Sequence, residues 1–186
     1  MAKIITDTSA LFSVEEGAGL GIGVLPLSVT LDGQTYREFV DISSDGFLEL
    51  LKKGGVPTSS QPSIGSVLDM YNRFPAEELL VLCMADGLSG TYQSACSAAK
   101  IADFPENITV LNTGTLAGPH RYLVEKAAAL AQEGLSAAQI STQLQPSLEN
   151  NKSFLIPNDF SFLKRGGRLT PLAAAVGGML KIVPVM

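Results

Sequence analysis

Short apolar runs alternate with amphipathic stretches along this chain of 186 residues. Residues 79–84 are continuously apolar, and residues 3–6 and 109–111 are shorter runs built around apolar residues; each run ends at a polar loop, as expected for strands buried in a parallel sheet. Helical spacing and end signals predict helices between the strands, and this alternation is typical of an α/β protein. We therefore predict a three-layer N-terminal α/β domain with a parallel sheet over residues 1–150, followed over residues 151–186 by the start of a second α/β domain.

The pattern also predicts elements outside the central sheet. Asp32-Gly33 is a turn between two strand-like stretches, so residues 24–40 are expected to form a hairpin. Residues 58–63 are rich in hydroxyl groups and are expected as a loop, and a change of composition at residues 146–151 marks the expected domain boundary. The other expected elements are helices over 45–53, 64–74, 92–102, 122–132 and 137–144, strands over 153–156 and 181–186, and a basic glycine loop over 164–168.

The charge of the chain limits its partners. With 13 Lys and Arg against 18 Asp and Glu the net charge is -5, which argues against a nucleic-acid binder and against docking on anionic lipid through a basic face. The first residues contain no apolar signal segment, and the longest weakly polar stretch, residues 169–180, is too short to span a bilayer. A cytoplasmic protein without stable membrane insertion is therefore expected.

Cysteine and histidine are too few for a disulfide framework or a His-based metal centre. Cys83 lies in an apolar run and Cys96 on a small-residue helix, so both are expected to serve packing. His120 is the only histidine, and its Gly-Pro neighbours indicate a turn, which argues against a Ser-His-Asp triad. The glycine-rich run at residues 17–23 lacks the spacing of a dinucleotide-binding loop and is expected as a helix end or turn.

Hydroxyl groups follow the strands of the predicted sheet. Residues 7–9, 85–91 and 112–115 come directly after strands, so they are expected at one sheet edge, where open α/β proteins bind ligands. Hydroxyls, backbone N–H groups and helix N-termini suit one negative charge, and these loops contain no Lys or Arg. A monoanionic carboxylate therefore fits better than a phosphate, with Arg168 as the best candidate for a nearby guanidinium. Taken singly, the hydroxyl residues of each loop more often cap the following helix than bind a ligand.

Several motifs in this order carry a resemblance to a known family. They are Pro-Thr-Ser-Ser-Gln-Pro-Ser at 57–63, Leu-Ser-Gly-Thr-Tyr-Gln-Ser-Ala at 88–95 and Phe-Leu-Lys-Arg-Gly-Gly-Arg at 162–168. Along essentially its whole length the chain resembles the DegV-like family of bacterial fatty-acid-binding proteins. The resemblance implies two α/β domains with a long-chain fatty acid buried between them. The carboxylate-binding residues that it implies are Ser59, Ser60, Ser89, Gly90, Thr91 and Arg168, and the candidates for support are Thr58, Asp7 and Thr113.

The resemblance also implies a role for the bound acid. Members of the family present it to a separate fatty acid kinase, which makes the acyl phosphate used in phospholipid synthesis, and they are carriers without catalytic residues, metal or cofactor. Relatives continue past residue 186, so the second domain is expected to be incomplete here. Two other interpretations stay open. One is a phosphoryl- or acyl-transfer enzyme that uses Asp7, with Asp86 as its second carboxylate; the other is a non-binding module that only associates with a partner.

Overall fold

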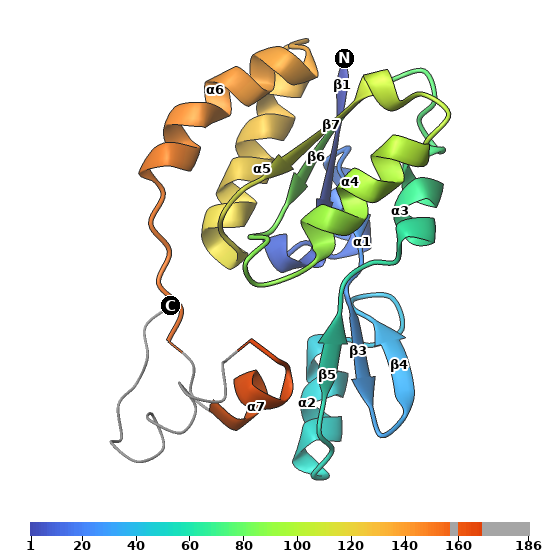
Figure 1. Ribbon diagram of the computed structural model, residues 1–186, viewed down its shortest axis with the longest axis vertical. Coiled ribbons are helices and arrows are strands. Elements are labelled where there is room, and N and C mark those ends of the chain that lie inside the picture. Colours follow the sequence, from blue (N-terminus) through green and yellow to red (C-terminus); the bar gives the residue numbers. More distant parts are fainter. Residues whose placement is uncertain (157–159, 169–186) are drawn as a thin grey trace.

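A parallel sheet of four strands lies at the centre of the molecule. The structure, a computed structural model, describes residues 1–156 and 160–168 of the chain. The strands are β1 (Ala2–Asp7), β2 (Gly23–Leu25), β6 (Glu78–Cys83) and β7 (Ile108–Asn112), in the order β2-β1-β6-β7 (Figure 1). The three apolar runs seen in the sequence form β1, β6 and β7, all running in one direction. The α/β fold class is therefore confirmed.

Helices cover both faces of this sheet and complete the three layers. They are α3 (Ile64–Tyr71) and α4 (Thr91–Ile101) on one face, and α5 (Ala117–Gln132) and α6 (Ala137–Asn150) on the other (Figure 1). Leu80 and Leu82 of β6 pack toward α5 and α6, whereas Val81 between them packs toward α3 and α4, because successive side chains of a strand alternate between its faces. Strand β6 is therefore buried on both faces, which explains its unbroken apolar run.

A second, smaller sheet forms what we call the small lobe, residues 28–60. Its antiparallel strands are β3 (Ser28–Leu31), β4 (Gln34–Arg37) and β5 (Thr58–Ser60), in the order β4-β3-β5, with α2 (Ser44–Lys52) beside them (Figure 1). The predicted hairpin turn is present, and Asp32 and Gly33 both have the positive φ that a tight hairpin turn requires. The expectation of a loop at Thr58–Ser60 was wrong, because this segment pairs with β3, a partner distant in the sequence.

Short helices make the connections. They are η1 (Thr8–Ala10) after β1, α1 (Val14–Gly19), η2 (Pro105–Asn107) and α7 (Phe160–Arg165). Helix α1 ends inside the glycine-rich run, as expected for that run. The expected basic loop over 164–168 is in part helical, since Lys164 and Arg165 end α7 and only Gly166 and Gly167 form a turn.

Two helix boundaries differ from the expectation at prolines. Helix α5 begins at Ala117 and contains Pro119 in its first turn, where a missing N–H costs no intrahelical hydrogen bond. His120 is therefore a fully buried helical residue, and the prediction that it lies in a turn was wrong. Helix α6 continues through Pro146 to Asn150, whose side-chain amide donates to the Pro146 carbonyl at 2.8 Å.

The segment after α6 also differs. Residues 153–156 form irregular chain in place of the expected strand, because neither sheet in the described part of the chain takes them as a neighbour. Phe154 and Ile156 are exposed there. The strand expected over 181–186 lies outside the described residues.

Candidate ligand-binding site

The polar loops that the sequence singled out meet at one edge of the central sheet. Asp7 ends β1 beside Leu25 of β2, and Cys83 ends β6 beside Asn112 of β7. The residues that follow form η1 and the starts of α4 and α5, at the edge that faces the small lobe (Figure 1). The expected ligand-binding edge is therefore bounded by the small lobe.

Asp7 and Thr113 hold the strand ends together at this edge. The fully buried Asp7 carboxylate accepts the backbone N–H of Ser9 through one oxygen and that of Met84 through the other, both at 3.0 Å. Thr113 Oγ1 donates to the backbone carbonyl of Cys83 at 2.9 Å. These bonds satisfy polar groups that would be costly to bury unpaired. Any support that Asp7 and Thr113 give to a ligand is therefore indirect.

At the start of α4, hydroxyl groups contact each other and a glutamine side chain packs against the first turn. Ser89 Oγ lies 2.9 Å from Thr91 Oγ1, and both side chains are buried. A Cβ atom at Gly90 would lie only 2.3 Å from Oε1 of Gln61, which follows β5. Gln61 Nε2 in turn donates to Ser94 Oγ at 3.0 Å. The absence of a side chain at Gly90 thus lets the end of β5 approach the first turn of α4.

Three of the predicted site residues line one cavity, which we call the central pocket. It measures about 320 Å³ and includes Thr58, Ser59 and Arg168. The guanidinium of Arg168 donates from Nε to the Leu88 carbonyl at 3.3 Å and from Nη1 to the Gly166 carbonyl. A guanidinium has five N–H donors, so donors remain for a ligand. The other lining residues are mainly apolar: Val29, Phe47, Pro57, Met84, Leu88, Leu116, Leu155, Leu163 and Gly166.

The other predicted site residues do not line the central pocket. Ser60 lines a separate, more polar cleft of about 520 Å³ with Gln61 and Arg37. Ser89 and Thr91 are buried against each other. The predicted carboxylate-binding residues therefore lie in three places: on the wall of the central pocket, in a separate cleft, and at the packed start of α4.

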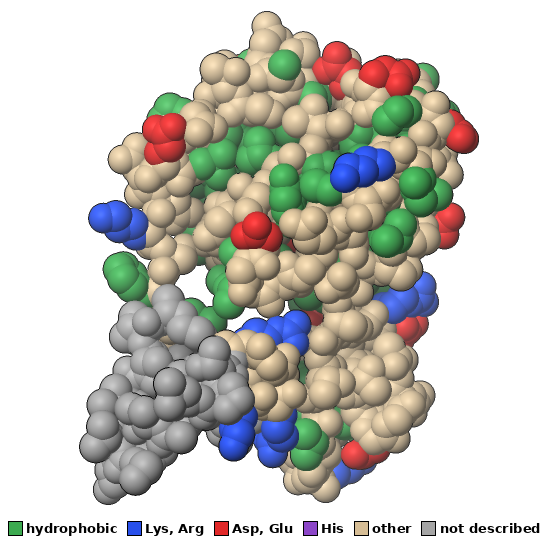
Figure 2. Space-filling view, viewed as in Figure 1, with side chains coloured by type: hydrophobic (Ala, Val, Ile, Leu, Met, Phe, Trp, Pro, Cys, Tyr) green, Lys and Arg blue, Asp and Glu red, His purple; other side chains and the backbone are tan. Residues whose placement is uncertain are grey.

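Two further cavities adjoin the central pocket. The hairpin pocket, about 300 Å³, shares Val29, Phe47 and Leu116 with it, and lies between η1 and the small lobe. The outer pocket, about 530 Å³, shares Leu88, Leu116 and Leu155 with it. The space-filling view shows a hollow between the central sheet with its helices, which we call the sheet domain, and the segment that contains α7, beside the small lobe (Figure 2). Volumes of this size are typical of small-molecule sites, and Leu116 belongs to all three cavities.

His120 is a polar residue of this edge that the sequence analysis placed wrongly. Its Nε2 lies 3.3 Å from the Leu82 carbonyl and 3.1 Å from Thr6 Oγ1, and its Nδ1 lies 3.2 Å from Ser9 Oγ. Burial lowers the pKa of His120 below its ordinary value, although the nearby Asp7 carboxylate opposes the shift. The one sequence signal for its true place was Pro119, which is tolerated in the first turn of a helix.

The hydrogen-bond partners of His120 determine where its proton lies. A backbone carbonyl only accepts, so its contact with Nε2 assigns the proton of the neutral ring to Nε2. Nδ1 is then an acceptor, and the Ser9 hydroxyl donates to it. The oxygen of Ser9 consequently offers lone pairs, and not its proton, to any neighbouring ligand.

Other features of the described residues set limits on the site. No helix among them is both long and apolar enough to cross a membrane. Nowhere in residues 1–156 and 160–168 do three or more His, Cys, Asp or Glu side chains gather as they would around a metal ion. Cys83 is buried and Cys96 half-buried, both as free thiols, in agreement with a packing role.

Comparisons with known proteins place the chain in a family. All of it, residues 1–186, matches the family described as "Uncharacterised protein, DegV family". A DegV domain-containing protein from Halalkalibacterium halodurans is 34% identical over 187 residues, which cover 98% of this chain and 66% of that protein. The chain spans about 65% of the length of the first curated relatives that it matches, which come from Staphylococcus aureus.

Solved structures show the same architecture. DegV from Bacillus subtilis, described as a fatty acid binding protein, matches 99% of this chain and 66% of its own with a TM-score of 0.85 at 28% identity. A Streptococcus pneumoniae fatty acid kinase B3 protein loaded with linoleic acid matches all of this chain and 67% of its own, with a TM-score of 0.80. At 23% identity this second likeness shows the fold alone.

Proposed function

Because this chain belongs to the DegV family, we propose that it binds one long-chain fatty acid in the central pocket, between residues 1–150 and the segment that follows them. The carboxylate lies at the polar part of the wall, beside Thr58, Ser59 and Arg168. The Bacillus subtilis neighbour, described as a fatty acid binding protein, supports this ligand class.

The observation that carries the proposal is the pairing of one guanidinium and two hydroxyls with apolar walls in a single cavity. An alkyl tail of about 14 methylenes gains roughly 11 kcal/mol on burial, before the costs of association. A buried carboxylate without partners would cancel several kcal/mol of that gain, so donors must replace its water. Arg168, Thr58 and Ser59 are the donors at hand, and a guanidinium matches a carboxylate well.

Within this proposal, Ser60, Ser89, Gly90 and Thr91 act mainly through the backbone. The Ser89–Thr91 pair fixes the start of α4, whose N-terminus carries a partial positive charge. Gly90 allows β5, and with it Ser59, to lie close to that helix end. This part of the predicted set would therefore orient the carboxylate site without each hydroxyl touching the ligand.

We also propose that the protein is a carrier that presents the bound acid to a fatty acid kinase for acyl phosphate formation. The position of Asp7 supports a carrier over the alternative of an enzyme that uses this residue as its acid. Asp7 is fully buried, and each of its carboxylate oxygens accepts a backbone N–H. A catalytic acid needs a free, accessible oxygen within hydrogen-bond reach of its substrate.

The test is a search for bound lipid followed by a comparison of variants. Protein purified without added ligand is denatured, and released fatty acid is identified by mass spectrometry. Palmitate affinity is then measured for Arg168→Met and Ser59→Ala, with Ser97→Ala on α4 as the matched control. Loss of a charge-assisted hydrogen bond should weaken binding about tenfold or more in Arg168→Met. Ser59→Ala should have a smaller effect and Ser97→Ala none.

Two results would contradict the proposal. One is protein that is free of lipid and does not bind added palmitate. The other is palmitate binding with equal affinity in Arg168→Met and Ser97→Ala, which would place the head group elsewhere.

A further inference from the structure

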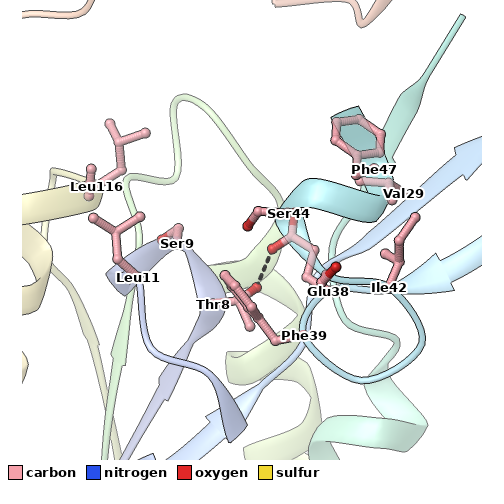
Figure 3. Close-up of a pocket in the computed structure, with 12 residues that line it drawn as sticks. Thr8, Ser9, Leu11, Val29, Glu38, Phe39, Ile42, Ser44, Phe47 and Leu116 are labelled. Atoms are coloured by element: carbon pink, nitrogen blue, oxygen red, sulfur yellow. Dashed lines mark hydrogen bonds between the residues drawn. The ribbon is translucent and has the colours of Figure 1, made fainter. Parts of the chain in front are cut away.

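The hairpin pocket has a lining that differs from that of the central pocket. Figure 3 shows it between η1, the small lobe and the start of α5. Most of its walls are apolar, with side chains from Leu11, Val29, Phe39, Ile42, Phe47 and Leu116. Unlike the central pocket, it contains no Lys or Arg among its lining residues, and its charged residue is Glu38.

The inner polar groups of this pocket are hydrogen-bond acceptors. Thr8 is buried, accepts the backbone N–H of Leu27 at 3.0 Å, and donates its hydroxyl proton to Oε2 of Glu38 (Figure 3). The proton of Thr8 is thus taken, and Oε1 of Glu38 is left to accept a further donor. Ser9 adds a second acceptor, since its own proton goes to Nδ1 of His120. The serines at the start of α2 are exposed to solvent at the rim.

The backbone around the pocket is held in an uncommon conformation. In the described part of the chain four residues other than glycine have positive φ, and three of them line this pocket: Leu11 (63°), Phe39 (58°) and Ala117 (53°). Such conformations cost on the order of 1–3 kcal/mol each and persist only where the surrounding structure imposes them. They come from three separate segments of the chain, so the fold shapes this cavity from three sides at once.

We propose that the hairpin pocket binds a hydroxyl group carried on the alkyl chain of the ligand, so that the preferred ligands include hydroxylated long-chain fatty acids. The inference rests on the proposed function, which puts the carboxylate in the central pocket. From there the chain passes Val29, Phe47 and Leu116, the residues shared by both cavities. The hydroxyl then donates to Glu38, with Ser9 as the alternative acceptor.

The charge of the pocket argues against two other occupants. A carboxylate would meet the Glu38 carboxylate and the lone pairs of Ser9, with no cation among the lining residues to offset the repulsion. A plain alkyl chain would fill the apolar walls but would strip water from Glu38 without replacing it. A hydroxyl group satisfies the acceptor and leaves the rest of the chain against the apolar walls.

The experiment compares positional isomers. Affinities of stearic acid and of hydroxystearic acids with the hydroxyl at different carbons are measured by isothermal titration calorimetry. One isomer should bind about tenfold more tightly than stearic acid and than the other isomers. That preference should fall several-fold in Glu38→Gln, which keeps the shape and the bond from Thr8 but removes the charge, and in Ser9→Ala. Glu49→Gln, on the exposed side of α2, should keep it.

Binding of a long-chain alcohol shows whether the hairpin-pocket inference or the proposed function has failed. Dodecanol lacks a carboxylate, so its binding tests the hairpin pocket without the head-group site. If stearic acid binds but no isomer is preferred, or the preference survives in Glu38→Gln, the hairpin-pocket inference is overturned and the proposed function stands. If no acid binds while dodecanol binds in a Glu38-dependent way, the head-group assignment fails and the hairpin pocket stands. Binding of neither overturns both, and melting curves confirm that each variant is folded.

Discussion

A substitution at Gly90, which contacts Gln61, tests how the small lobe is held against the sheet domain. In Gly90→Ala the new Cβ would lie 2.3 Å from Oε1 and 2.6 Å from Nε2 of Gln61, so the Gln61 amide must move away. Its hydrogen bond to Ser94 Oγ is then lost. The backbone itself is not strained, because φ of Gly90 is -74°, a value that alanine readily adopts.

The expected magnitude depends on whether Gln61 is present. Loss of the hydrogen bond should cost about 0.5–1.5 kcal/mol of unfolding free energy. Replacing glycine by alanine by itself raises the unfolding free energy by about 0.4–1 kcal/mol, because the unfolded chain becomes less flexible. In a Gln61→Ala background the Cβ has room, so Gly90→Ala should be stabilising there and neutral to destabilising in the original chain. The control is Gly87→Ala, which meets no atom within 4 Å and should behave alike in both backgrounds.

Urea denaturation of the four chains of this double-mutant cycle measures the coupling directly. We expect about 1 kcal/mol of non-additivity between positions 61 and 90. Palmitate affinity should follow the same pattern, since displacement of Gln61 also displaces the adjoining β5, which carries Ser59. If Gly90→Ala has the same effect on stability with and without Gln61, the two residues are not in contact as described.

Two further predictions concern the packed interior. Gly17→Ala should lower the unfolding free energy by about 1–3 kcal/mol, since its Cβ would lie 2.3 Å from Val24 Cγ2. The control is Gly19→Ala in the same helix, whose Cβ would meet open space. Equal urea midpoints for the two variants would contradict this prediction. Burial lowers the pKa of His120 in the folded protein. As the pH falls below the ordinary value of 6.5, the unfolded chain binds a proton at this residue that the folded protein does not bind. The free energy of unfolding is therefore unaffected by this residue above pH 6.5 and decreases as the pH falls toward the pKa of the folded state. His120→Gln should therefore flatten the pH dependence below about pH 6.5, and an unchanged slope would show that His120 is not responsible.

The parts of the fold set by local chemistry could be predicted from the sequence. The run that became β6 is apolar at every position because both faces are covered, and Asp32-Gly33 permits the positive φ of a hairpin turn. Ser136 and Gln139 stand three residues apart in the sequence and form a capping box at the start of α6, each side chain bonded to the backbone of the other. In each case the decisive interaction lies within a few residues in the sequence.

The parts that could not be predicted depend on distant partners. Thr58–Ser60 is a strand only because β3 offers it a free edge, and its polar residues give no local sign of that pairing. Residues 153–156 show the reverse, a mainly apolar stretch that neither sheet of the described residues takes as a strand. The hairpin pocket was missed for the same reason, since Glu38 and Thr8 meet only when the small lobe folds against η1.

The structure separates the polar groups that hold the fold from those that can meet a ligand. Asp7, Thr113 and His120 lie at the sheet edge where a site was expected, yet their hydrogen bonds go to the ends of β1 and β6 and to neighbouring loops. The groups on cavity walls come instead from the small lobe and from the segment after α6, as with Ser59 and Arg168. Substitutions in the first set should therefore act on stability before they act on affinity. In the proposed site Ser59 and Arg168 lie on two separately connected segments, so the position of the small lobe relative to residues 160–168 would decide whether the two side chains converge on one carboxylate.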